Sequence, residues 1–397
     1  MQSEELLPTI ALLALLAVAI WKGVKATGLL GKRPFSLEGK VVVITGAGSG
    51  IGRRLAQKLF AETKDVTLAL LDIDLASLKR LQAELLQPQG SDRPKSVLVF
   101  QCDVADLRYD SARSPTCVLG RVRLALGAWT AQTKAECIAY SDSATESCIA
   151  RLTTAIAPKH IGVLVNNAGK KVASCIVTGR PLEDLTPEQI QKTFAVNTLA
   201  HFWTVKAALP SMKKASEALL VTVSSVMGMT SSAGLTDYCA SKAADCIPPD
   251  HIGSKLTVRA PSHAAATVRL ELWRDNVTSI RTLLVCPAAV DTGMFKGVLA
   301  ADDWAVMIAR MFIPMLSESE VVEAIYRAMR RGDQLLVSCF SGWRGIVLSW
   351  APALSRLLPV PLYDLVVRLG GGVNGMDTFV GKQGSTAETS SPEDPRA

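Results

Sequence analysis

The feature that most constrains the fold of this chain is a glycine-rich junction between a short apolar run and a helical stretch. The run covers residues 40–45, and the helical stretch covers 51–61. The segment that joins them reads Thr45-Gly46-Ala47-Gly48-Ser49-Gly50-Ile51-Gly52. Glycines in such a strand-to-helix turn let the backbone approach a pyrophosphate, which then lies at the positive N-terminal end of the helix. A tight turn also needs glycine for its own geometry, so this motif alone only points towards a dinucleotide.

Strands and helical segments alternate through most of the chain. The predicted strands are 40–45, 66–72, 96–103, 161–166, 218–224 and 279–287, and the predicted helical segments are 51–61, 75–86, 186–214 and 317–332. Thr186 with Gln189, and Ser317 with Glu320, have the spacing of helix-starting capping boxes. Continuous Val, Leu and Ile runs are typical of parallel strands that are covered on both faces. We therefore predict an α/β fold with a doubly wound parallel sheet of Rossmann type.

Acidic residues close two of the predicted strands. Asp72 lies 20 residues after Gly52, at the end of the second strand. A carboxylate there can accept hydrogen bonds from the hydroxyls of the adenosine ribose and would repel a 2′-phosphate, which favours NAD over NADP. The alternative is that Asp72 only ends a strand. Asp103, after the third strand, is placed to reach the adenine edge by the same geometry.

A second motif, Tyr238-Cys239-Ala240-Ser241-Lys242, places a phenol and an ammonium at i and i+4 on one helical face. A phenol with its ordinary pKa near 10 is a poor acid–base catalyst at neutral pH, but a neighbouring cation favours the phenolate. Lys242 can also hold a nicotinamide ribose. Ser225 precedes Tyr238 by 13 residues, at a strand end, where its hydroxyl could polarise a reacting oxygen. The alternative interpretation is a solvated helix face.

Taken together, the ordered motifs resemble the short-chain dehydrogenase/reductase family. They are the glycine-rich turn, Asp72, Cys102-Asp103-Val104, Asn166-Asn167-Ala168-Gly169, Asn197, Ser225 and the Tyr238–Lys242 motif. The resemblance implies that Ser225 polarises the substrate oxygen and that Tyr238 is the general acid–base. It also implies that Lys242 tunes Tyr238 and grips the ribose, while Asn197 holds a water in a proton relay.

The same resemblance implies a cofactor site and a subgroup. The implied cofactor-binding residues are Gly46, Ser49, Gly50, Ile51, Gly52, Asp72, Asp103, Val104, Asn167, Ala168, Gly169, Tyr238, Lys242, Pro287, Val290 and Thr292. The segments 197–203, 290–295 and 375–379 resemble membrane-bound retinol dehydrogenases and their hydroxysteroid relatives. The implied function is NAD(P)-dependent interconversion of a lipophilic, retinol-like alcohol and its carbonyl. A hydroxysteroid, a fatty alcohol or a sphingoid ketone as substrate, and a catalytically silent membrane or lipid-droplet protein, remain the alternatives.

The N-terminus predicts a membrane anchor within residues 1–25. Residues 6–21 carry no charge, and Lys22, Lys25, Lys32 and Arg33 follow them. Positive charge after the apolar segment predicts that the remaining chain faces the cytosol, from the endoplasmic reticulum or a lipid droplet. A cleavable signal peptide is the alternative, but the acidic residues at positions 4 and 5 are wrong for one.

Residues 36–342 are expected to form the single dehydrogenase domain, with two irregular stretches inside it. The stretches are 107–143 and 246–263, and the second begins four residues after Lys242. Genuine insertions and retained intron sequence both explain them, and residues 264–272, which read like the rest of the interrupted helix, favour the second. Residues 343–380 are apolar but contain three prolines in 343–369, which argue against a regular membrane span, so we expect the segment either to belong to the core or to lie in a membrane interface. Residues 381–397 have the composition of a disordered tail.

Composition excludes several other classes of function. Lys and Arg number 43 against 36 Asp and Glu, a scattered net charge of +7 that makes nucleic acid an unlikely partner and an anionic membrane surface a better one. The nine cysteines form no CxxC pair and the four histidines have no metal spacing, so neither a disulfide framework nor a metal site is expected. The sequence leaves a homodimer open.

Overall fold

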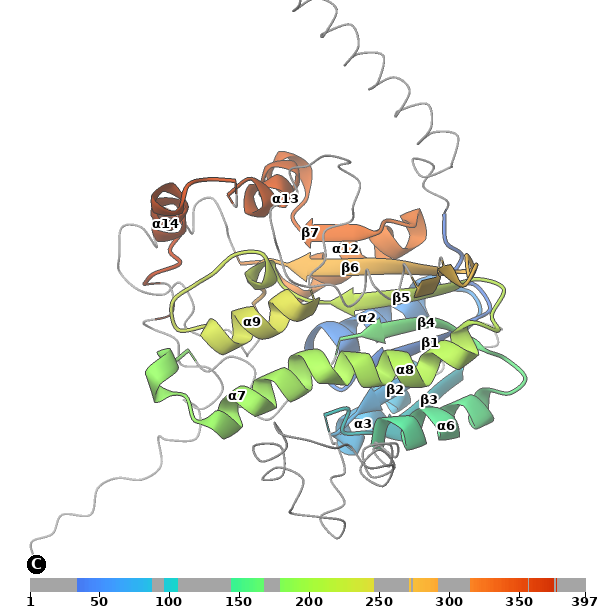
Figure 1. The fold of residues 1–397 in the computed structure, drawn as a ribbon. Coiled ribbons are helices and arrows are strands. Elements are labelled where there is room, and N and C mark those ends of the chain that lie inside the picture. Colours follow the sequence, from blue (N-terminus) through green and yellow to red (C-terminus); the bar gives the residue numbers. More distant parts are fainter. Residues whose placement is uncertain are drawn as a thin grey trace, which may run out of the picture.

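The computed structural model describes residues 34–87, 96–105, 144–167, 179–245, 271–272, 274–291, 315–355, 357–374 and 376. These residues form a seven-stranded sheet in the order β3-β2-β1-β4-β5-β6-β7, with every neighbouring pair parallel (Figure 1). The strands are β1 (Lys40–Thr45), β2 (Val66–Asp72), β3 (Ser96–Gln101), β4 (Ile161–Asn166), β5 (Ala218–Val223), β6 (Ile280–Pro287) and β7 (Leu335–Ser338). The predicted doubly wound sheet is confirmed, and its strand order reverses between β1 and β4, where such sheets bind ligands.

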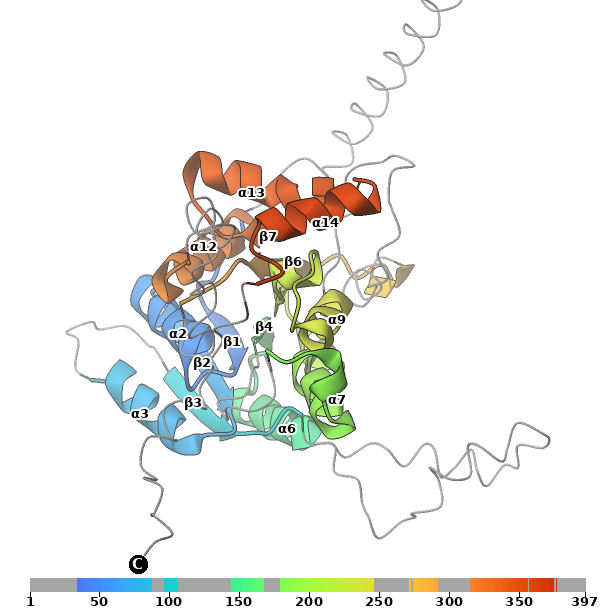
Figure 2. The same ribbon diagram turned by 90° about the vertical axis from the view of Figure 1, so that its left-hand side faces the viewer.

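Helices cover both faces of the sheet (Figures 1 and 2). One face carries α2 (Gly50–Glu62), α3 (Leu75–Leu85) and α12 (Glu318–Arg331), and the other carries α6 (Ala144–Ile156), α7 (Pro187–Phe194), α8 (Ala200–Met212) and α9 (Thr236–Asp245). Three short turns, η2 (Leu182–Asp184), η3 (Ala195–Leu199) and η4 (Val226–Gly228), lie between these elements. Beyond β7, α13 (Gly342–Ser355) and α14 (Val360–Leu369) lie side by side in both views.

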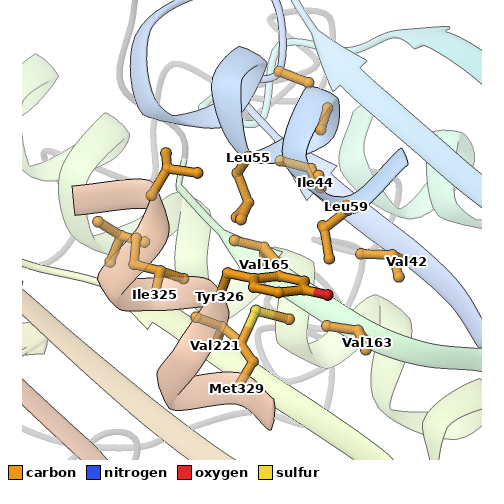
Figure 3. Close-up of a cluster of buried hydrophobic side chains, with 14 of the residues drawn as sticks. Val42, Ile44, Leu55, Leu59, Val163, Val165, Val221, Ile325, Tyr326 and Met329 are labelled. Carbon is orange, nitrogen blue, oxygen red and sulfur yellow. The ribbon is translucent and has the colours of Figure 1, made fainter. Parts of the chain in front are cut away.

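The side chains of β1 alternate between two hydrophobic cores. Val42 and Ile44 pack in the core under α2 and α12, whereas Val41 and Val43 pack in the core under α6 and α8. Figure 3 shows the first of these cores, where Leu55 of α2 lies near Ile44 in the same cluster. A strand whose side chains are buried in both directions reads as a continuous apolar run, which is why this strand could be predicted.

Five of the six predicted strand ranges agree with the structure to within one residue at each end. The third strand is two residues shorter than predicted, because the Asp103 carboxylate turns the chain by accepting the backbone N–H of Ala105 at 3.1 Å. The strand β7 was not predicted, since its four residues are too few to show a pattern.

The predicted helical segment 186–214 begins as expected but is not one regular helix. Its capping box is confirmed, because Gln189 N–H donates to Thr186 Oγ1 at 3.3 Å and the Gln189 side chain accepts from Thr186 N. A π-helical turn, Ala195–Leu199, then separates α7 from α8. Such wide turns occur mostly at functional sites, and this one contains Asn197. The second capping box, at Ser317 and Glu320, is also confirmed, and Gly332 ends α12 with φ +71°.

Several predictions fall outside the described residues. They concern the anchor in 1–25, the irregular stretches 107–143 and 246–263, and the tail 381–397. Within the part of the chain that the structure describes, no helix is both long and apolar enough to span a bilayer.

Candidate active site

The glycine-rich turn joins β1 to α2 at the reversal point of the sheet. Gly46 and Gly50 have φ values of +67° and +54°, in the left-handed region that favours glycine. A Cβ atom on Gly52 would overlap the Gly46 carbonyl and lie 2.6 Å from Asn167 Nδ2, so no side chain fits there. Ser49 is the N-cap of α2, and within the described chain its side chain makes no capping hydrogen bond. The turn therefore places glycine backbone and a serine hydroxyl at the start of a helix, where an anion is stabilised.

Asp72 contacts this turn directly. Its carboxylate accepts the backbone N–H of Gly48 at 2.8 Å and that of Asp74 at 3.0 Å, and the residue is buried. A carboxylate offers about four acceptor positions, so these two bonds fix its orientation without using its full capacity. The structure thus brings the predicted acidic residue and the predicted glycine turn together.

Three further predicted residues, Asp103, Val104 and Asn167, follow the ends of β3 and β4. Cys102 N–H donates to the Asp72 carbonyl at 2.9 Å, which places Asp103 beside Asp72 along the edge of the sheet, and Val104 is buried. Asn167 follows β4, and its side-chain Nδ2 donates to the Thr45 carbonyl at 3.2 Å while its backbone N–H donates to Thr45 Oγ1 at 3.0 Å. Asn167 therefore ties the end of β4 to the end of β1. Ala168 and Gly169 lie outside the described residues.

Tyr238 and Lys242 occupy α9 and are 4% and 7% exposed, so they do not form the solvated helix face considered as an alternative. Lys242 Nζ donates to the Val223 carbonyl at the end of β5, at 3.2 Å. Ser224 Oγ donates to the Lys242 carbonyl at 2.9 Å. These two bonds fasten α9 to the end of β5, and hence to Ser225, which follows Ser224.

Ser225 begins the short turn η4. Its Oγ accepts the backbone N–H of Met227 at 3.1 Å, which orients the hydroxyl oxygen. The same residue lines an apolar cavity of about 260 Å³. Tyr238 does not line this cavity, but it packs with Leu235 and Met376, which both do.

A buried network that the sequence did not indicate holds α9 against the π-helical turn. Asn197 Nδ2 donates to Ser241 Oγ at 3.0 Å, and Ser241 Oγ donates to the Tyr238 carbonyl at 2.8 Å. Thr198 Oγ1 donates to the Ser241 carbonyl at 2.9 Å, so both residues of the turn meet the same serine. The only signal for Ser241 was its place inside the motif around Tyr238.

A separate buried hydrogen bond joins the end of α7 to the start of α9. Thr193 Oγ1 donates to Asp237 Oδ2 at 2.7 Å, and both residues are buried. Asn197 Oδ1 is buried and has no hydrogen-bond partner among the described residues. A buried acceptor of this kind is a position at which an ordered water is expected.

The segment after β6 lines the same cavity. Ala288 and Ala289 line it, and the Ala289 carbonyl accepts Leu316 N–H at 2.9 Å. Of the three residues predicted here for cofactor contact, Pro287 ends β6, Val290 is buried and forms a β-bridge with Leu316, and Thr292 lies outside the described residues.

Comparisons with known proteins agree with this arrangement. A family profile described as short chain dehydrogenase matches residues 40–113 and 118–246. Retinol dehydrogenase 10-B of Danio rerio is 32% identical over 322 residues, 78% of each chain, and retinol dehydrogenase 10 of Homo sapiens is 33% identical over 71% of this chain and 69% of its own. A solved short-chain type dehydrogenase/reductase from Mycobacterium ulcerans, 14% identical, shares the fold with a TM-score of 0.50 over 75% of this chain and 84% of its own. The chain therefore belongs to the short-chain dehydrogenase family of oxidoreductases, in a retinol dehydrogenase-like subgroup.

Proposed function

We propose that this protein interconverts a lipophilic, retinol-like alcohol and its carbonyl, with NAD as the cofactor and Tyr238 as the acid–base group. The observation that carries the proposal is the buried Tyr238–Lys242 pair, fastened by Lys242 to the strand end that presents Ser225 to an apolar cavity. Bound NAD supplies the hydride acceptor for the carbinol carbon, and its reduced form supplies the hydride for the reverse reaction.

The residues at the reversal point of the sheet fit a dinucleotide. Gly52 leaves open the space that a Cβ would fill, and the start of α2 stabilises a pyrophosphate. The fixed carboxylate of Asp72 would accept ribose hydroxyls and would repel a 2′-phosphate, which carries close to two negative charges. We therefore expect NAD to be preferred. The measurement is kcat/KM with each cofactor, and a value for NADP equal to or above that for NAD would contradict this part of the proposal.

The chemistry at the substrate oxygen follows from three side chains. During oxidation Tyr238 takes the hydroxyl proton of the alcohol, and during reduction it returns a proton to the carbonyl oxygen. The Lys242 cation, one helical turn away, favours the phenolate that this role requires. Ser225 donates a hydrogen bond to the reacting oxygen and holds it in place. We further propose that a water on Asn197 Oδ1 carries the proton away from this site, since that buried acceptor has no partner among the described residues.

The cavity supports a lipophilic substrate. Beside Ser225 it is lined by apolar side chains that include Met227, Leu235, Phe340 and Leu348. A pocket of this kind gains affinity from apolar area and orients its ligand through a few polar groups. Relatives that are named retinol dehydrogenases at about 30% identity make retinol the first substrate to test. Hydroxysteroids, fatty alcohols and sphingoid ketones share the same chemistry and complete the panel.

The test uses membranes that contain the full-length protein, supplied with retinol and NAD, with retinal and NADH followed over time. The control is Tyr238→Phe, which keeps the ring among Val196, Leu235 and Met376 but removes the hydroxyl. We expect the variant to lose roughly 100-fold or more in kcat. Equal rates would contradict the mechanism. Binding of NAD without turnover of any lipophilic alcohol would instead favour a catalytically silent member of the family.

We also propose that the protein is held at the endoplasmic reticulum or lipid-droplet membrane, with its catalytic domain in the cytosol. The support is the uncharged segment 6–21 and the four basic residues that follow it. Protease treatment of sealed microsomes should digest the domain. Full protection of the domain would place it in the lumen and contradict this orientation.

A further inference from the structure

The outer side of α13 carries an apolar stripe that faces away from the rest of the protein. Val347, Trp350 and Leu354 are spaced at i, i+3 and i+7, and each is more than half exposed. Surface helices of soluble proteins turn such a stripe towards the core. Here the helix is fastened by its other side, where Gly345 is buried and Ser349 Oγ donates to the Val337 carbonyl of β7 at 3.2 Å.

The neighbouring helix α14 continues this surface. None of its residues is buried, although most of them are large and apolar. We define the apolar face as the exposed hydrophobic side chains of residues 347–373. They are Val347, Trp350, Leu354, Leu357, Leu358, Val360, Leu362, Leu365, Val366, Leu369 and Val373. These are eleven of the fifteen large hydrophobic side chains that are exposed in the described chain, so the exposure is concentrated rather than scattered.

The inner side of α14 is held in a fixed orientation by the segment that follows Ser225. Tyr363 Oη lies 2.9 Å from Ser231 Oγ, and the Gly372 carbonyl accepts both Ser232 Oγ at 2.9 Å and Ala233 N–H at 2.8 Å. These polar contacts fasten α14 and the turn that follows it to residues 231–233. The apolar face is therefore a built surface of the folded domain.

The same two helices separate the apolar face from the catalytic cavity. Leu348 and Pro352 of α13 and Val366 and Val367 of α14 line the cavity that Ser225 also lines. Figure 2 shows α13 and α14 next to each other at the end of the molecule beyond β7. Val366 both lines the cavity and belongs to the apolar face. The cavity that Ser225 lines therefore lies directly beside the apolar face.

We propose that the apolar face docks on a phospholipid bilayer, and that the lipophilic substrate enters the cavity from the bilayer between α13 and α14. The entry route of the substrate rests on the proposed function, whereas the docking on a bilayer does not. The composition of the segment favours lipid over a protein partner. Residues 347–373 contain three charged residues, Arg356, Asp364 and Arg368, against eleven exposed large apolar side chains, whereas protein interfaces have a polar rim. Trp350 and Tyr363 are the aromatic types that gather at bilayer surfaces.

The link between the N-terminal apolar segment and the folded domain is short. Twelve residues separate that segment from Pro34, where the described chain begins, and twelve extended residues reach at most about 43 Å. Phe35 N–H donates to the Arg330 carbonyl at the end of α12, 3.0 Å away, and α12 precedes β7 and α13 in the chain. If residues 6–21 are inserted in a membrane, the domain is held within reach of that same membrane.

The docking is tested on the full-length protein in phosphatidylcholine vesicles whose acyl chains carry bromine, which quenches tryptophan that enters the hydrocarbon region. The contribution of Trp350 is obtained as the difference between the wild-type protein and Trp350→Phe. We expect that contribution to be quenched by at least about half. An unquenched Trp350 would overturn the docking, and an unquenched Trp350 in a chemically cross-linkable dimer would assign the face to a second copy of the chain. This measurement needs no catalytic activity.

The entry route is tested with the double variant Leu362→Gln, Leu365→Gln, neither of which lines the cavity. We expect KM for retinol dissolved in vesicles to rise roughly fivefold or more, with kcat/KM for a short water-soluble alcohol unchanged. The matched control is Leu86→Gln, Leu182→Gln, which changes two similarly exposed leucines elsewhere. An equal rise in the control, or none in the variant, would overturn the route. If the wild-type protein oxidises no alcohol, the proposed function fails, while the quenching result still decides the docking.

Discussion

Helices α12 and α14 lie within 30 residues of each other in the chain, and both carry large apolar residues at helical spacing. In α12 this pattern is buried: Val321, Val322, Ile325 and Met329 are at most 3% exposed and pack against the sheet (Figure 3). In α14 no residue is buried. Similar sequence patterns therefore serve different purposes, because the sheet has a face to cover beside α12 and ends at β7 before α14. Apolar area stabilises the fold in the first helix and remains available for binding in the second.

The largest expected effect is on protein stability, when truncation of a buried residue in α12 is compared with truncation of an exposed residue in α14. Ile325→Ala leaves a cavity in a fully buried core and should reduce the free energy of unfolding by about 2–5 kcal/mol. Leu365→Ala removes a side chain that is 49% exposed and should change it by less than about 0.5 kcal/mol. Urea unfolding of the full-length protein in one detergent, followed by circular dichroism, compares the two midpoints. A loss at Leu365 as large as that at Ile325 would mean that α14 contributes to the cooperative core.

The two helices also begin differently, which gives a prediction of intermediate size. Ser317 caps α12 by accepting Glu320 N–H at 3.2 Å, whereas the N-cap residue of α14 is Pro359, which makes no side-chain capping bond in the described chain. Ser317→Ala should therefore cost about 1 kcal/mol in the same unfolding experiment. The control is Ser319→Ala, which removes a hydroxyl 3.0 Å from Ser317 Oγ but leaves the bond from Glu320 N–H to Ser317 in place. Equal losses in the two variants would show that the cap is not the source of the effect.

The contrast between these helices shows what the sequence could and could not predict. The glycine turn and Asp72 could be predicted from their spacing, and the buried strands from continuous apolar runs, because both are local features of the sequence. For the α13–α14 segment the sequence left core and membrane interface as alternatives, since its burial depends on where the sheet ends. The strand that ends the sheet, β7, has only four residues and shows no pattern of its own.

The residues of the active site also fall into those that the sequence could predict and those that it could not. Tyr238, Lys242 and Ser225 were identified from spacing and from the order of motifs. Thr198 and Ser241 were not, because their bond joins residues 43 positions apart and depends on how the π-helical turn and α9 approach each other. No local pattern contains that information. The π-helical turn around Asn197 could not be predicted either, since the sequence there reads as continuous helix.

The smallest expected effect concerns the charge at the start of α12 and its dependence on pH. Hydrogen bonds from the Ser317 backbone N–H and, to a smaller extent, from its hydroxyl keep the pKa of the Glu320 carboxyl below its ordinary value. A group whose pKa is lower in the folded state stabilises the fold above its unfolded pKa, near 4.3, and that stabilisation is lost as pH falls through the folded pKa. Glu320→Gln keeps a side chain that can complete the capping box but removes the charge. We expect the variant to be less stable than the wild type by a few tenths of a kcal/mol at pH 7, because Glu320 is largely exposed, and this difference should shrink as the pH falls below about 4.3 and vanish once it is below the folded pKa. The control is Asp364→Asn, which removes the one carboxylate of α14. We expect its unfolding midpoint to match that of the wild type at pH 7. A wild-type advantage at Glu320 that does not decrease as the pH falls would assign the effect to hydrogen bonding rather than to charge.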